Sequence, residues 1–116
     1  MLDERRNSNR IDLRVPVQYR TKSKEQTIGC LSHDLSTEGV GINVEDFMPL
    51  NSEVSLQIGL QPNKVVEING KISWIQTIPY ADRYRIGVRF EDDDVSYFAK
   101  QEIKKFLEQS KAKLNP

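Results

Sequence analysis

The feature that most constrains the fold of this chain is a two-residue alternation of apolar and polar side chains, repeated in six short runs. This period is typical of β-strands with one buried face. Turn-forming residues separate the runs, and the long helices that a parallel sheet needs between its strands are missing. The sequence therefore predicts an all-β fold, a six-stranded antiparallel barrel that is closed or nearly closed. The predicted strands cover residues 13–20, 27–35, 40–44, 54–60, 66–74 and 84–90.

Three of these runs carry a more detailed expectation. Pro16 has no amide hydrogen for a ladder, so it predicts that the first strand lies at an edge or beside a bulge. In the second run, Ile28, Cys30 and Ser32 are expected on one face. In the fifth run, Trp74 continues the alternation and is expected on the same face as the apolar residues before it.

The period changes at the acidic run 91–94, which suits a helix N-terminus because aspartate caps the first amides. A C-terminal helix is predicted over about residues 94–112. Its apolar stripe is expected to pack on the barrel, and the sharper alternative is a helix that binds a partner. The stripe comprises Val95, Phe98, Ala99, Ile103, Phe106 and Leu107.

Length and charge suggest one domain, residues 12–116, preceded by a flexible arginine-rich arm, residues 1–11. Residues 1–24 contain seven Lys/Arg and three Asp/Glu, whereas residues 25–116 contain ten and fourteen. A basic head on an acidic body indicates an anionic partner for the head, although a solvated tail contacting its own body explains the charge equally well. A broad nucleic-acid surface is disfavoured because it needs a basic face over much of the domain.

Catalysis is poorly supported, and no catalytic residue, metal site or cofactor is predicted. His33 and Cys30 are the only histidine and cysteine, and a separation of three places them on opposite strand faces. Cys30 fits a small core residue, while His33 is a polar strand residue or a ligand contact. No run is apolar and long enough for membrane insertion, and a lone cysteine fits a reducing compartment, so the sequence predicts a cytoplasmic protein.

An arginine cluster in the arm is better suited to ligand binding. Arg6 and Arg10 have the spacing Arg-x-x-x-Arg, and Arg5 directly precedes them. A guanidinium presents a planar fork of donors that matches phosphate oxygens and the O6 and N7 acceptors of guanine. A flexible segment with such groups can wrap an anionic purine ligand and become ordered on binding.

A second stretch, residues 34–39, supplies what the arm lacks. Asp34 can accept hydrogen bonds from the N1–H and N2–H₂ edge of guanine, Ser36 can donate or accept, and Gly39 permits a positive φ and close approach of a ligand. An ordinary Asx or Ser/Thr turn between two strands is the alternative. The two stretches together predict one site for a ligand with phosphate and guanine groups.

These motifs resemble the PilZ domain, a bacterial receptor module for cyclic di-GMP. The family pattern is Arg-x-x-x-Arg before the first strand and (Asp/Asn)-x-Ser-x-x-Gly after the second, matched here by residues 6–10 and 34–39. The runs 70–74 and 86–90 also look like the family. The resemblance implies a split six-stranded barrel with a C-terminal helix. It also implies that Arg6 and Arg10 contact phosphate and guanine, and that Asp34, Ser36 and Gly39 contact a guanine.

In the family, an arginine directly before the motif is associated with an intercalated dimer of the ligand, and Arg5 has that position. The resemblance implies a non-catalytic cyclic di-GMP receptor or adaptor. Ligand would order the arm over the barrel and change the interaction with an unidentified downstream protein. One rival is a ligand-independent protein adaptor of the same fold. The other is a small barrel that binds single-stranded nucleic acid, which the acidic body and few aromatic residues disfavour.

Overall fold

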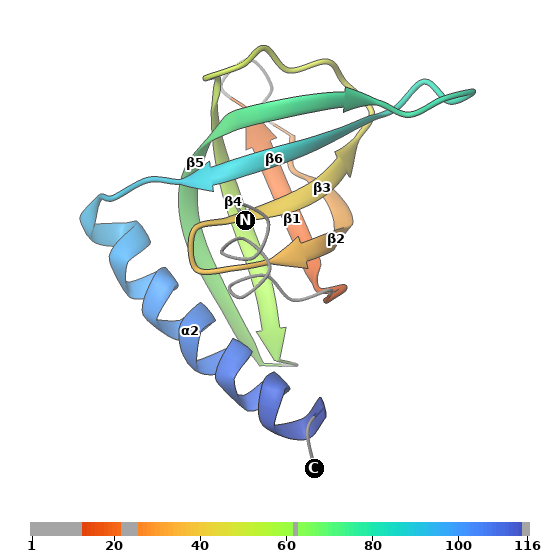
Figure 1. The fold of residues 1–116 in the computed structure, drawn as a ribbon. Coiled ribbons are helices and arrows are strands. Elements are labelled where there is room, and N and C mark those ends of the chain that lie inside the picture. Colours follow the sequence, from red (N-terminus) through yellow and green to blue (C-terminus); the bar gives the residue numbers. More distant parts are fainter. Residues whose placement is uncertain (1–12, 22–25, 62, 115–116) are drawn as a thin grey trace, which may run out of the picture.

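The computed structural model describes residues 13–21, 26–61 and 63–114, and these form a closed antiparallel barrel with one helix (Figure 1). The strands follow the order β1-β2-β3-β6-β5-β4 around the barrel. The predicted fold is thereby confirmed. The strands are β1 (Pro16–Thr21), β2 (Ile28–Leu35), β3 (Gly39–Val44), β4 (Glu53–Gln61), β5 (Lys64–Thr77) and β6 (Tyr84–Phe90), and the helix is α2 (Asp94–Leu114).

The alternation in the sequence produces this barrel because every second residue points inward. The four apolar residues of β4, from Val54 to Leu60, are all at least nine-tenths buried, with exposed or half-buried residues between them. Each fully buried aliphatic side chain contributes roughly 1.5–3 kcal/mol. The fully buried side chains of the interior include Val17, Leu35, Ile42, Leu56, Ile58, Ile68, Ile72, Ile86 and Val88.

Pro16 predicted that β1 lies at an edge or beside a bulge, and of these two alternatives the edge is wrong, whereas a register shift does occur in the neighbouring strand β4, between Gly59 and Gln61. β1 pairs with β2 on one side and with β4 on the other, because the closed barrel has no edge. Pro16 is accommodated differently, as the first residue of the strand. A Cβ on Gly59 would lie 3.5 Å from the Pro16 ring, so the ring lies directly against β4.

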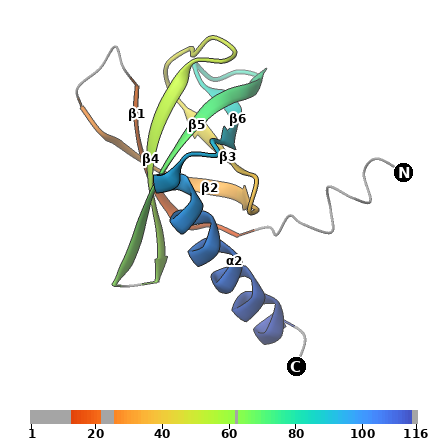
Figure 2. The ribbon, with the colours of Figure 1, turned by 90° about the vertical axis from the view of Figure 1, so that its left-hand side faces the viewer.

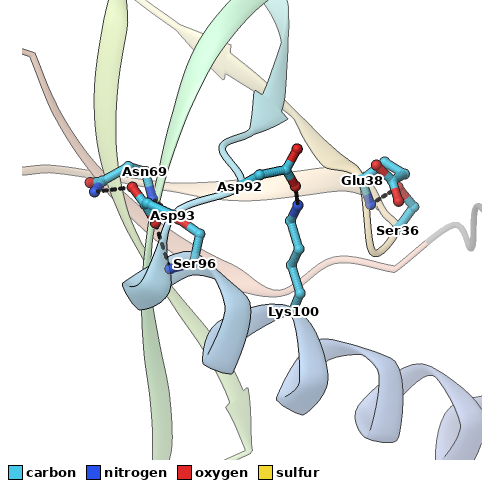
Figure 3. Close-up of polar contacts among 7 residues, drawn as sticks. All are labelled: Ser36, Glu38, Asn69, Asp92, Asp93, Ser96 and Lys100. Atoms are coloured by element: carbon cyan, nitrogen blue, oxygen red, sulfur yellow. Dashed lines mark hydrogen bonds and ion pairs between the residues drawn. The ribbon is translucent and has the colours of Figure 1, made fainter.

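Helix α2 begins with a side-chain cap that also fixes its orientation on the barrel. Asp93 Oδ1 accepts a hydrogen bond of 2.8 Å from the Ser96 N–H, which confirms the predicted aspartate cap (Figure 3). The buried Ser96 Oγ accepts a 3.2 Å bond from the Asn69 N–H of β5. These two contacts turn the Ser96 side of the helix towards the sheet.

The face that α2 buries differs from the predicted stripe. Ala99, Ile103 and Leu107 are buried against β5, but Val95 is 54% and Phe98 is 72% exposed. Only part of the predicted stripe therefore packs on the barrel. The helix extends beside the barrel and away from its body, as the turned view shows (Figure 2). It is not long and apolar enough to cross a membrane, and no other helix is described.

Candidate functional site

The predicted turn after β2 is built around the side chain of Ser36. Its Oγ accepts a hydrogen bond of 3.1 Å from the Glu38 N–H (Figure 3). It accepts a second, also of 3.1 Å, from the Gly39 N–H, and Ser36 N donates to Gly39 O at 2.9 Å. Ser36 is only 5% exposed, so its hydroxyl is used within the turn. This geometry is the Ser/Thr turn that the sequence left open as an alternative. The predicted contact between Ser36 and a guanine stays a prediction.

Gly39 is required for a reason other than the expected one. None of the six glycines, all of which the structure describes, has a positive φ, so Gly39 does not use the left-handed backbone that glycine permits. A Cβ on this residue would instead lie 2.3 Å from the Val88 carbonyl oxygen of β6, which leaves no room for a side chain. The Phe90 N–H also donates to the Glu38 carbonyl at 2.8 Å. The turn is therefore held tightly against the end of β6.

Asp34 faces the outside of the barrel because β2 contains a bulge. Ser32 pairs with Ile42 and Asp34 with Gly41, so His33 is the extra residue between them. The Asp34 Oδ1 accepts a 3.1 Å hydrogen bond from the Gly41 N–H, and the carboxylate lies where a side chain at position 41 would otherwise stand. His33 Nε2 is 2.7 Å from Asn43 Oδ1, which makes it a polar strand residue as predicted.

Trp74 also faces outward, and here the expectation that it shares the face of Ile72 is wrong. Ile72 pairs with Val88 but Trp74 pairs with Gly87, so Ser73 is an extra residue and the alternation shifts by one. Ile75 takes the next inward position and packs against the core. The indole lies over Gly87, since a Cβ there would be 2.1 Å from Trp74 Nε1.

The two bulges align four residues in one row across four neighbouring strands. Asp34 pairs with Gly41, Gly41 with Gly87, and Gly87 with Trp74. Neighbouring strands lie about 4.8 Å apart, so the two glycines form a short floor that the carboxylate and the indole cover from opposite sides. The row therefore brings a hydrogen-bond acceptor and a flat aromatic ring together on the outer surface.

Two exposed arginines on β6 flank this row. Arg85 pairs with Asn43 and Arg89 pairs with Gly39, so they lie on either side of Gly87 on the same outer face. Sequence reasoning missed these arginines and Trp74 as site residues. The glycine inside each of the runs 40–44 and 84–90 was the available signal, because an interior strand glycine often marks a close approach.

The described chain begins at Leu13, beside the same strand, and runs from there into β1. The fully buried Ser32 Oγ accepts from Val15 N–H at 3.0 Å and donates to the Leu13 carbonyl at 2.5 Å, and Ser32 N donates to Val15 O at 3.0 Å. The chain before β1 is thereby fixed two residues from Asp34. The predicted arm and its ligand residues Arg5, Arg6 and Arg10 lie outside the described residues.

Cys30, the one cysteine of the chain, is half-buried in the barrel wall. Burial raises the pKa of Cys30 to about 11, so its thiol is a poor nucleophile near neutral pH. It packs against the core as a small apolar residue, as the sequence predicts. Within residues 13–21, 26–61 and 63–114, no three His, Cys, Asp or Glu side chains gather as metal ligands would.

Comparison with known proteins identifies the fold and the family. No curated protein matches the chain. The inhibitor of motility MotI/DgrA from Bacillus subtilis has a similar structure, with a TM-score of 0.76 and 16% identity over 93% of this chain and 52% of its own. YcgR from Escherichia coli, solved in complex with c-di-GMP, has a TM-score of 0.71 and 15% identity over 90% of this chain and 45% of its own. PlzA from Borreliella burgdorferi, also in complex with c-di-GMP, has a TM-score of 0.58 and 15% identity over 90% of this chain and 44% of its own.

The chain thus spans about half the length of each of these three proteins. At such low identity, the similarity shows a shared fold. The family follows from the sequence model of the PilZ domain, which matches residues 4–109 and so covers both the arginine motif and the turn after β2. The chain belongs to the PilZ domain family.

Proposed function

We propose that this domain binds cyclic di-GMP on the outer face of β2, β3, β6 and β5. The observation that carries the proposal is the row from Asp34 over Gly41 and Gly87 to Trp74. Membership of the PilZ family supports the choice of ligand, as do the cyclic di-GMP complexes of YcgR and PlzA.

The chemistry of the row fits a guanine base. The Asp34 carboxylate can accept from the N1–H and N2–H₂ groups of guanine, which the arginines of the arm cannot do. The indole of Trp74 offers an aromatic surface, and stacking of a base on an aromatic ring contributes about 1–3 kcal/mol. The glycine floor lets a flat ligand approach the backbone closely. Ser36 and Gly39 contribute by holding the turn in place.

The arginines supply the charge that a ligand with two phosphates requires. Arg10 is three positions before Leu13, so the backbone can carry it at most about 10 Å from that anchored position. Arg6 has a longer reach of about 25 Å, which spans the row. Arg89 and Arg85 add two exposed cations on the barrel itself. Arg5 would stack on the base of a second ligand, which gives a stoichiometry of two ligands per domain.

Binding would order the arm over the barrel and so create or hide a surface for another protein. A ligand-independent adaptor is the second candidate, and the exposed Val95, Tyr97 and Phe98 at the start of α2 favour it. These side chains are apolar, and none of them belongs to the core. Such an adaptor would use this surface whether or not the site on the barrel is filled.

Calorimetric titration with cyclic di-GMP tests the proposal, with GTP and cyclic di-AMP as control ligands. Arg6→Ala, Arg10→Ala and Asp34→Ala should each raise the dissociation constant at least about 30-fold, since losing a hydrogen-bonded charge costs about 2–5 kcal/mol. Arg20→Ala, at the far end of β1, is the matched control and should bind like wild type. Arg5→Ala should reduce the stoichiometry from two ligands to one.

Wild-type affinity in both Arg6→Ala and Arg10→Ala would show that the site is wrongly assigned. No binding by the wild-type protein would exclude the receptor function and leave the adaptor. Trp74 is the only tryptophan, so its fluorescence gives a second readout that reports directly on the proposed floor of the site. A wild-type domain that binds ligand without any change in this fluorescence would remove Trp74 from the site.

A further inference from the structure

The outer face of β1 and β4 carries a second row of aligned residues, across the barrel from the row that begins at Asp34. Leu31 of β2 pairs with Pro16 of β1, and Gly59 of β4 pairs with Val65 of β5. A Cβ on Gly59 would lie 3.5 Å from the Pro16 ring, so the two pairs form one row. In the closed strand order, β1 and β4 lie opposite β6 and β3, and Figure 2 shows them to the left of those strands. The row is therefore separate from the site proposed for cyclic di-GMP.

This second row is apolar and exposed. Leu31 is 53% and Val65 is 63% exposed, and Pro16 is exposed between them. Beside the row lies a groove of about 550 Å³, whose wall also includes the half-buried Leu13 and Phe106. Single apolar residues are common on protein surfaces, but a contiguous apolar patch usually marks a contact with another molecule.

The glycines of the chain indicate that this contact is close. At four of the six, namely Gly39, Gly41, Gly70 and Gly87, an added Cβ would lie 3.0 Å or less from another atom, so internal packing explains them. The two others, Gly29 and Gly59, lie in the strands on either side of β1. A Cβ would have open space at Gly29 and an ordinary contact at Gly59, and neither residue has a positive φ. The register shift after Gly59 does not require glycine either, because the bulge that does so has a positive φ. A strand glycine without an internal role often marks the close approach of another backbone.

The polar residues beside the row are mainly uncharged amides. Gln18 of β1 pairs with Gln57 of β4, and both are exposed. Gln61 borders the groove, and Arg14 is the only charged residue of its described lining. A glutamine amide both donates and accepts, so it can pair with another glutamine. A strongly charged rim would select a partner of opposite charge, whereas this rim suits a second copy of the same face.

A two-fold axis between β1 and β4, running along the strands, makes this face complementary to itself. Such an axis exchanges the two strands, so Pro16 meets Gly59 of the second copy. Each proline ring then occupies the space above the glycine of the other copy. By the same operation Gln18 meets Gln57 of the second copy, and the two apolar ends of the row meet each other.

We propose that the outer face of β1 and β4 is the interface of a two-fold symmetric dimer of this chain. The row spans only about 14 Å across four strands, so the dimer is weak and reversible. The outer faces of β3 and β6 point away from the interface in both copies. The dimer would thus present two separate ligand faces, and its formation does not depend on cyclic di-GMP.

Sedimentation velocity of the full chain, from about 10 μM to 1 mM, tests this proposal. The wild-type protein should show a monomer–dimer equilibrium without larger species, because a two-fold contact is closed. Gly59→Leu adds an apolar side chain where the proline of the second copy lies. Specific docking predicts that it raises the dissociation constant at least about tenfold, whereas unspecific apolar association predicts a lower one. Val65→Ser removes apolar area without adding bulk and should weaken the dimer about 3- to 10-fold.

Two control variants locate the contact. Phe98→Ala, on the exposed start of α2, and Ile11→Ser, in the chain before Leu13, should both dimerise like wild type. Gly59→Leu should retain the circular dichroism spectrum and the response to cyclic di-GMP of wild type, so its effect does not come from misfolding. The inference is overturned if the wild-type protein stays monomeric up to 1 mM, or if either control variant abolishes the dimer. It is also overturned if Gly59→Leu dimerises at least as tightly as wild type, or if Val65→Ser leaves the dissociation constant unchanged.

Discussion

The packing of Trp74 over Gly87 leads to a sharp prediction for the substitution Gly87→Ala. The new Cβ would lie 2.1 Å from the indole Nε1 and 2.4 Å from Cε2, far inside van der Waals contact. The indole must therefore leave its place on the floor of the row. Gly87 is buried only because this ring covers its outer side, so the interior of the barrel is not directly affected.

The expected loss of stability follows from two opposing effects. Inserting a methyl group into a packed position costs about 1–3 kcal/mol. Replacing glycine within a strand returns roughly 0.5–1 kcal/mol, because alanine loses less backbone freedom on folding. The net loss of unfolding free energy is therefore between about 0 and 2.5 kcal/mol. Gly29→Ala in β2 is the matched control, since a Cβ there has no atom within 4 Å and only the gain remains.

Urea unfolding followed by far-ultraviolet circular dichroism measures both changes, and the fluorescence of the lone Trp74 reports whether the ring has moved. Combining Gly87→Ala with Trp74→Ala removes the clash, so the double variant should be no less stable than Trp74→Ala alone. Equal unfolding free energies for Gly87→Ala and Gly29→Ala, with unchanged emission of Trp74, would refute the described packing.

Three further predictions concern the frame of the site. Ser32→Ala should lower the unfolding free energy by about 2–3 kcal/mol in urea titrations, because it leaves the buried Val15 N–H without its acceptor, and Ser32→Thr is the control that keeps the hydroxyl. Hydrogen bonds from Ser96 lower the pKa of Asp93 below its ordinary value of 3.8. The ionised carboxylate therefore stabilises the fold fully at a pH above 3.8, and this stabilisation is lost as the pH falls through the lower pKa of the folded state. Asp93→Asn should flatten this acid dependence of the melting temperature. Cys30, with a pKa of about 11, should react with iodoacetamide at pH 8 at least tenfold more slowly in the native protein than in urea, and equal rates would contradict its burial.

Local patterns in the sequence were sufficient to predict the barrel. A two-residue period can be recognised from neighbouring residues alone. Buried and exposed residues alternate along β4 and β6 as this period predicts, and the one additional buried residue is Gly87, which the indole of Trp74 covers. The edge position that Pro16 suggested is wrong because closure of the barrel is a property of all six strands. A proline can mark an edge or the first residue of a strand, and the local sequence does not distinguish these cases.

The rotation of α2 depended on contacts that are distant in the sequence. Near its start the helix has apolar residues on two sides, with Val95 and Phe98 on one and Ala99 and Ile103 on the other. Helical periodicity cannot choose between them. The bond from Asn69 to Ser96, across 27 residues, turns the second side towards β5.

The candidate site depends even more strongly than α2 on contacts between residues that are distant in the sequence. The motif that includes Asp34 and Gly39 is contiguous, so its place around the turn after the second strand could be predicted. The structure has Asp34 near the end of β2 and Gly39 at the start of β3. The inclusion of Trp74 requires a bulge in β5 to match a glycine in β6, and no contiguous motif records that match. The predicted roles of the arm arginines stay predictions.

The outer row exists only because two strands depart from the alternation that builds the core. With Ser32 inward, strict alternation in β2 would turn Asp34 into the interior, where an ionised carboxylate is very costly. With Ile72 inward, strict alternation in β5 would likewise turn the Trp74 side chain into the interior. One extra residue in each strand reverses both orientations and returns Leu35 and Ile75 to the core side. The central strands β3 and β6 pair without a register shift. They have Gly41 under the Asp34 carboxylate and Gly87 under the Trp74 indole, where any larger residue would collide with these groups. Removing either bulge should therefore damage the site and the core together, so the residues that break the pattern are those most constrained by the proposed function.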